Sequence, residues 1–110
     1  MSLLESQFQK KLCAKLDKFI NDGLPLYYFV KEAKSIRGIP DLILCCNGHF
    51  VALELKRTQD EAEKTGGRIA LQKYTLTRIQ RAHGFGYLVY PENADETLKE
   101  IYNLCDPKFH

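Results

Sequence analysis

Two acidic residues and a lysine form the set in this sequence that is best suited to chemistry. Asp41 follows Gly38-Ile39-Pro40 and opens an apolar run, and Glu54-Leu55-Lys56 closes the next apolar run. Carboxylate and carbonyl oxygens suit the hard cations Mg²⁺ and Mn²⁺. Such an ion polarises a phosphodiester and lowers the pKa of a bound water. The residue types therefore suggest a metal-dependent hydrolase, provided that the fold brings Asp41 and Glu54 together.

The sequence between the two acids predicts a tight hairpin. Asn47-Gly48 favours a two-residue β-turn, so we expect strands over 41–46 and 49–56 on either side of it. In this register the residue numbers of each facing pair add up to 95, which places Asp41 opposite Glu54, with Lys56 on the same face. Two opposed carboxylates are destabilising by themselves. We therefore expect Lys56 and a bound cation to compensate for them.

The other elements must position this hairpin. Apolar residues spaced by four predict a helix over 4–20 that stops at Gly23, and Pro25 opens a strand over 26–30. Further along we expect a flexible loop over 58–68, a helix over 69–83 ended by Gly84, a strand over 87–90 and a helix over 94–104 with Asn93 as N-cap. The hairpin strands are apolar on both faces. The order αβββαβα thus predicts one α/β domain over 1–110, with a mixed sheet of about four strands and helices on both faces.

Composition narrows the class of protein further. Apolar residues make up 45% of the chain and charged residues 27%, which is ordinary globular usage, and the net charge is only +2. The four cysteines contain no C-x-x-C pair, so they indicate buried thiols in a reducing compartment rather than a zinc site. No signal peptide or membrane span is visible. We expect a cytoplasmic protein. The stretch from Arg57 to Arg81 is locally basic, which suits a polyanionic ligand but equally suits a solvated helix face.

These motifs resemble the PD-(D/E)xK nuclease superfamily, whose pattern matches Gly38-Ile39-Pro40-Asp41 followed by Glu54-Leu55-Lys56. Closer still, the chain resembles the VRR-NUC family of virus-type replication-repair nucleases, in the stand-alone form found in phages and bacteria. The matching pieces are Glu5, residues 35–42, residues 54–56, Leu71-Gln72 and His83-Gly84. The resemblance implies a restriction-endonuclease-like αβββαβα core.

The resemblance also implies a function. The protein would be a Mg²⁺- or Mn²⁺-dependent DNA endonuclease that acts on branched, flap or junction DNA in replication, repair or recombination, in a bacterial or phage-infected cell. Asp41, Glu54 and the Leu55 carbonyl would bind the metal, and Glu5 would reach it directly or through water. Lys56 would be catalytic, and Gln72 would line the site. The related archaeal Holliday-junction resolvases are homodimers, which implies a dimer here.

Outside this centre, four basic residues are candidates for binding DNA phosphates: Arg37, Arg57, Arg68 and Lys73. Each of them could equally be a solvated surface residue. Glu54 and Lys56 could likewise be a surface ion pair at a strand end. Two rival functions therefore stay open beside the nuclease. One is a non-catalytic nucleic-acid-binding module on the same fold, and the other is a structural subunit in which the ion pair only holds the hairpin.

Overall fold

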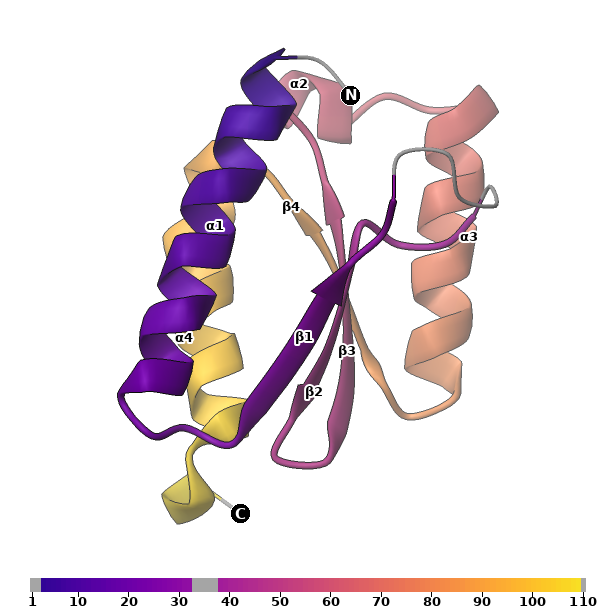
Figure 1. The fold of residues 1–110 in the computed structure, drawn as a ribbon. Coiled ribbons are helices and arrows are strands. Elements are labelled where there is room, and N and C mark those ends of the chain that lie inside the picture. The colour runs from indigo at the N-terminus through magenta and orange to yellow at the C-terminus, as the bar shows by residue number, and fades with distance from the viewer. Residues whose placement is uncertain (1–2, 33–37, 110) are drawn as a thin grey trace.

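A computed structural model describes residues 3–32 and 38–109, and in these ranges a sheet lies between helices (Figure 1). The predicted fold class, a mixed α/β sheet with helices on both of its faces, is confirmed. The elements in chain order are α1 (Leu3–Asn21), β1 (Leu26–Val30), β2 (Leu42–Cys46), β3 (His49–Leu55), α2 (Gln59–Ala62), α3 (Gly67–Arg81), β4 (Phe85–Val89) and α4 (Ala94–Cys105), with 3₁₀ turns at Pro91–Asn93 and Pro107–Phe109.

Within the described residues, four strands form the sheet in the order β1-β2-β3-β4. β2 pairs antiparallel with both β1 and β3, whereas β4 pairs parallel with β3. A parallel neighbour requires a crossover connection. Here the segment that contains α2 and α3 connects β3 to β4. The same segment places α3 on one face of the sheet.

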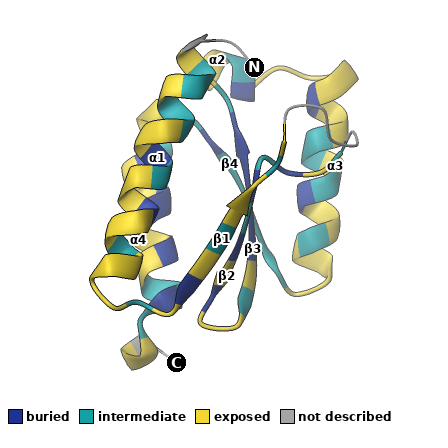
Figure 2. Ribbon diagram, viewed as in Figure 1, coloured by how far each residue is buried: buried dark blue, intermediate teal, exposed yellow. Residues whose placement is uncertain are grey.

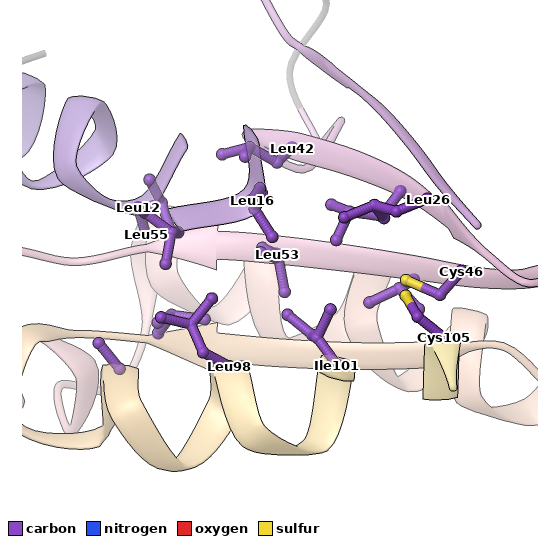
Figure 3. Close-up of a cluster of buried hydrophobic side chains, with 14 residues drawn as sticks. Leu12, Leu16, Leu26, Leu42, Cys46, Leu53, Leu55, Leu98, Ile101 and Cys105 are labelled. Atoms are coloured by element: carbon purple, nitrogen blue, oxygen red, sulfur yellow. The ribbon is translucent and has the colours of Figure 1, made fainter. Parts of the chain in front are cut away.

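The main core lies between the sheet and the pair of helices α1 and α4, which share one face, while α3 lies on the other (Figure 1). Figure 3 shows how leucines of α1 meet the strands, with Leu12 beside Leu55. The buried cluster contains Leu12, Leu16, Leu26, Leu42, Leu44, Cys46, Val51, Leu53, Leu55, Val89, Ala94, Leu98, Ile101 and Cys105. No helix in the described ranges has the length and apolarity needed to cross a membrane.

Small residues let α3 lie close to its face of the sheet. Ala52 and Gly86 face each other on β3 and β4, and a Cβ on Gly86 would come 3.1 Å from the Cβ of Leu76. Leu76 is buried, and Gln72 precedes it by one helical turn. Residue 54 lies two positions beyond Ala52 on the same face of β3. Because α3 packs close to the sheet, Gln72 lies next to Glu54.

The hairpin turn and its register are as predicted. Asn47 and Gly48 both have positive φ, 49° and 87°, which is the conformation of a type I′ turn. The ladder pairs Cys46 with His49 and continues to Leu42 with Leu53. The strand bounds differ, because β2 begins at Leu42 and β3 ends at Leu55. Asp41 therefore lies just before the ladder instead of forming its last pair with Glu54.

The segment expected to be a flexible loop over 58–68 is partly helical. Thr58 caps α2, since its hydroxyl accepts a hydrogen bond from the Glu61 N–H at 3.2 Å. At the far end of α3, His83 and not Gly84 takes the left-handed conformation, with φ 68°. A side chain does not fit at Gly84, because a Cβ there would come 2.9 Å from Cγ2 of Ile79. β4 then begins at Phe85, two residues earlier than predicted.

Asn93 is the N-cap residue of α4, as predicted, but its side chain does not cap the helix. The Asn93 side chain turns back toward the preceding strand, accepting a hydrogen bond from the Tyr90 N–H at 2.8 Å and donating one to the Leu88 carbonyl at 3.0 Å. It makes no side-chain cap bond to α4. Asn93 thus joins the end of β4 to the start of α4 through its own 3₁₀ turn.

The sheet is not buried on both faces along its whole width. On the face that carries α3, Tyr27 of β1 is 68% exposed, Phe29 is 50% exposed and Phe50 of β3 is 49% exposed. Figure 2 shows the same pattern, with exposed residues along β1. Helices therefore pack on both faces, as predicted, but they leave this face uncovered at Tyr27 and Phe29 of β1 and at Phe50 of β3. This face is covered beside β4, where α3 packs, and open beside β1.

Candidate active site

A pocket of about 360 Å³ lies where β3 ends and gathers most of the predicted site residues. The first turns of α1 form one wall, the first turns of α3 form another, and the ends of the strands form the floor. The lining residues are Glu5, Ser6, Gln9, Lys31, Asp41, Glu54, Leu55, Lys56, Arg68 and Gln72. Seven of these ten come from the predicted set, which is why this pocket is the candidate site.

Asp41 is fixed from both sides of its strand. Its Oδ2 accepts a hydrogen bond from the Leu55 N–H at 2.8 Å, and its Oδ1 lies 3.8 Å from Nζ of Lys31. The Asp41 carbonyl also accepts the Lys31 N–H at 2.8 Å. The carboxylate is mostly buried, with 15% of its side chain exposed. Asp41 thus ties the end of β1 to the end of β3.

Glu54 is a buried acid, with only 2% of the residue exposed. Gln72 donates a hydrogen bond from Nε2 to Oε1 of Glu54 at 3.1 Å, and Glu54 also hydrogen-bonds with Asp41. Burial raises the pKa of Glu54 first, and the hydrogen bond and negative charge of Asp41 raise it further, to about 8. The charges of Lys56 and Lys31 lower this pKa without offsetting the other effects.

Lys56 lies in the pocket as an ammonium without a close acidic partner. In the described part of the chain, no ion pair within 4 Å includes Lys56, although its charge lowers the pKa of Glu54. Its N–H bonds to the Val89 carbonyl at 2.8 Å, which anchors its backbone to β4. The alternative of a surface ion pair between Glu54 and Lys56 is therefore wrong, since Glu54 is buried and the pair does not form.

The Leu55 backbone faces Asp41 while its side chain lies in the core. In a strand, the N–H and C=O of one residue point toward the same neighbour. Since the Leu55 N–H bonds to Asp41, the Leu55 carbonyl points toward the same edge. Pro40 would be the next residue to face Leu55 in the hairpin register, and proline has no N–H to donate. This leaves the carbonyl available to a ligand in the pocket.

Glu5 lines the pocket but does not join Asp41 and Glu54 in a cluster of acids. The hydrogen bond with Glu61 raises the pKa of Arg57 most, and the charge of Glu5 raises it further. Among residues 3–32 and 38–109, no three His, Cys, Asp or Glu side chains lie close enough together to hold a metal ion. Two carboxylates and a backbone carbonyl thus remain as the oxygen donors, and contact of Glu5 with a metal through water stays a prediction.

Two amide oxygens in the same pocket bear on whether a cation fits. Oε1 of Gln9 and Oε1 of Gln72 are buried, and no donor in the described residues reaches either atom. An unsatisfied buried acceptor costs about 1–3 kcal/mol. Hydrogen-bond acceptors beside two carboxylates are satisfied by a ligand that is positively charged or that donates hydrogen bonds. Oxygen donors of this kind are the ligands that Mg²⁺ and Mn²⁺ take, either directly or through their waters.

The four basic residues that were candidates for binding DNA phosphates differ in whether they line the pocket. Arg68 lines the pocket, whereas the guanidinium of Arg57 pairs with Glu61, its Nε donating to Oε1 at 2.7 Å. Lys73 donates to the Lys64 carbonyl at 3.2 Å and does not line the pocket. Arg37 lies outside the described residues. Arg68 is thus the basic residue from this set that the structure brings to the acids.

Sequence reasoning missed Lys31, Ser6 and Gln9. Lys31 directly follows β1, so only the pairing of β1 with β2 could have shown that it reaches Asp41. Gln9 had a weak signal, because it follows Glu5 by four residues and therefore lies on the same side of α1.

Comparisons of this chain with protein families, with curated proteins and with solved structures found no match.

Proposed function

We propose that this protein is a metal-dependent DNA endonuclease that hydrolyses phosphodiester bonds. The observation that carries the proposal is the contact between Asp41 and the buried Glu54 beside Lys56, in a pocket lined by further oxygen acceptors. A purely structural role gives no reason to bury an acid next to another acid, since this arrangement raises the pKa of Glu54 to about 8. Buried acids with perturbed pKa values are typical of functional sites.

In this proposal six of the ten residues that line the pocket have a role. Asp41, Glu54 and the Leu55 carbonyl would hold Mg²⁺ or Mn²⁺, which when bound would polarise the phosphodiester and lower the pKa of a water. Gln72 orients the Glu54 carboxylate through its amide. Lys56 would stabilise negative charge that develops on the phosphate in the transition state. Arg68, at the rim on α3, would bind a neighbouring phosphate.

A cleavage assay tests the proposal directly. Labelled flap, junction and plain duplex DNA, with a single-stranded RNA for comparison, are incubated with the protein in Mg²⁺, Mn²⁺ or EDTA. We expect cleavage that EDTA abolishes and that favours branched substrates. Asp41→Asn, Glu54→Gln and Lys56→Met should each lower the rate by at least about 10²-fold. The control Glu96→Gln, an exposed acid on α4, should cut at the wild-type rate.

The same experiment separates the rival functions. Binding of DNA without cleavage, in both metals and on all substrates, would indicate the non-catalytic nucleic-acid-binding module. Neither binding nor cleavage would indicate the structural subunit. Full activity in Glu54→Gln would refute the site even if the protein proved to be a nuclease. The proposal places this activity in the cytoplasm of a bacterial or phage-infected cell.

We also propose that the protein acts as a homodimer through the uncovered part of the sheet. Tyr27 and Phe29 share one face with Cys45 and Phe50, and all four residues are exposed. Burying aromatic side chains of this kind is a common source of interface stability. Light scattering should give twice the 12.7 kDa chain mass. Phe29→Glu should give the monomer mass, while Ile20→Glu on α1 should not.

A further inference from the structure

Gln9 belongs to the candidate site although no sequence motif points to it. It lies on α1, one helical turn after Glu5, and lines the pocket with Asp41, Glu54 and Lys56. Its amide oxygen is buried, and no donor within the described ranges reaches it. A buried carbonyl oxygen in a folded protein normally accepts a hydrogen bond. Because Gln9 lines the pocket, an ion or molecule bound there is a candidate donor for this bond.

The surroundings of Gln9 restrict what that donor can be. Across the pocket, Gln72 also has a buried amide oxygen without a donor among the described residues, while its Nε2 is used by Glu54. Oε1 of Glu54 accepts that bond, and both oxygens of Asp41 face donors or cations. Hydrogen-bond acceptors from α1 and from α3 therefore lie around the two acids in the pocket. A hydrated divalent cation matches this arrangement, because its waters donate hydrogen bonds outward.

We propose that Gln9 is a positioning residue that receives, on the α1 side, a hydrogen bond from the hydration shell of a cation held by Asp41 and Glu54. This rests on the proposed metal-dependent function. In metal sites, groups that bond to the ligands or waters and not to the metal typically change the metal affinity by 10–100-fold when they are removed. Gln9 would therefore set how tightly the site holds its cation, without touching the DNA.

The direct test measures Mn²⁺ binding in the absence of DNA, from the electron paramagnetic resonance signal of free Mn²⁺. Gln9→Leu removes the acceptor at similar size, and we expect its Mn²⁺ dissociation constant to rise by about tenfold or more. Gln9→Glu keeps an acceptor oxygen and should bind within about threefold of wild type or tighter. The matched control is Gln7→Leu, two residues earlier on α1 where the residue is exposed, which should bind like wild type.

Thermal unfolding without metal shows whether Gln9→Leu folds, and Gln9→Met at the same position repeats the test if it does not. A purely structural glutamine would change the melting temperature and leave Mn²⁺ affinity unchanged. A second readout is cleavage as a function of Mg²⁺ concentration. Excess Mg²⁺ should restore the rate of Gln9→Leu and should not restore that of Glu54→Gln.

The outcomes separate this proposal from the one on which it rests. Wild-type affinity for Mn²⁺ in Gln9→Leu and Gln9→Met, together with loss of binding in Asp41→Asn, would overturn the role of Gln9 and leave the metal site standing. Absence of Mn²⁺ binding by the wild-type protein would overturn both. Weaker binding in the Leu and Met variants, with recovery in Gln9→Glu, would support both.

Discussion

Replacing Glu54 by glutamine should make the metal-free protein more stable at neutral and alkaline pH while abolishing the proposed activity. Glutamine has the shape of a protonated glutamate. Its Oε1 can accept from Gln72, and its Nε2 can donate to Asp41, as the protonated acid does. The variant therefore keeps the contacts of Glu54 and removes only its ability to ionise.

The size of the effect follows from the pKa of Glu54, which lies at 4.5 in an unperturbed chain and at about 8 in the folded protein. Below pH 4.5 the acid is protonated in both states, so its contacts contribute their full stability. As the pH rises from 4.5 to 8, the unfolded chain ionises and the folded protein does not, so stability is progressively lost. Linkage gives a loss of about 1 kcal/mol at pH 5, 3 kcal/mol at pH 7 and 5 kcal/mol at pH 9.

Urea unfolding followed by circular dichroism, in EDTA at pH 5, 7 and 9, measures this loss. The free energy of unfolding of Glu54→Gln minus that of wild type should increase by about 4 kcal/mol from pH 5 to pH 9. The same difference for Glu96→Gln, an exposed acid on α4, should stay near zero. A difference for Glu54→Gln that is flat across this range would refute the reasoning, because it would mean that Glu54 ionises as easily in the folded protein as in the unfolded chain.

Three further perturbations test other parts of the structure. Arg68→Ala should weaken DNA binding and lower the slope of log affinity against log salt by about 1, and an unchanged slope would exclude a phosphate contact. Lys31→Met removes the cation near Asp41, so urea unfolding without metal should show a loss of about 1–3 kcal/mol that added Mn²⁺ partly reverses; equal stability would count against this ion pair. Gly86→Ala places a methyl group 3.1 Å from Leu76, so it should destabilise by about 1–3 kcal/mol and slow cleavage by displacing α3, and wild-type stability would show that α3 can shift freely.

The parts of the fold that local chemistry determines were predictable from the sequence. The Asn47-Gly48 turn needs two residues with positive φ, and this requirement alone fixes which residues of β2 and β3 face each other. The placement of Asp41 near Glu54 followed from that register. The exact contacts of Asp41 did not follow from the register. Pro40 cannot donate to the ladder, and the Asp41 side chain accepts the hydrogen bond from the Leu55 N–H.

The parts that depend on distant pairing were not predictable. Lys31 reaches Asp41 because β1 and β2 pair with Val30 opposite Leu42, and the long connection between these strands leaves that register open in the sequence. The uncovered face of β1 was missed for a similar reason. The apolar hairpin strands predict a sheet that is buried on both faces, but how α3 packs on the sheet depends on Gly86, which lies far along the chain.

Charge count alone does not distinguish a structural cluster from a metal site, because the pocket is lined by three acids and by three basic residues. Geometry does. Lys31 lies 3.8 Å from Asp41 and also donates to the Ile39 carbonyl, and Lys56 forms no ion pair within 4 Å in the described ranges. Glu54 is thus left with an amide and another acid as partners, and neither lysine brings its pKa back to an ordinary value. An apolar residue would satisfy such a position better if holding the hairpin were its only role.

A divalent cation supplies the positive charge that the lysines do not, and it binds the ionised form of its ligands. Mn²⁺ should therefore stabilise the wild-type protein most at alkaline pH, where the metal-free protein is weakest. It should also shrink the stability gap between wild type and Glu54→Gln at pH 9, since the variant lacks the second carboxylate. The comparison uses the same urea titrations in saturating Mn²⁺ and in EDTA. A gap of equal size in both buffers would mean that Asp41 and Glu54 do not share a cation.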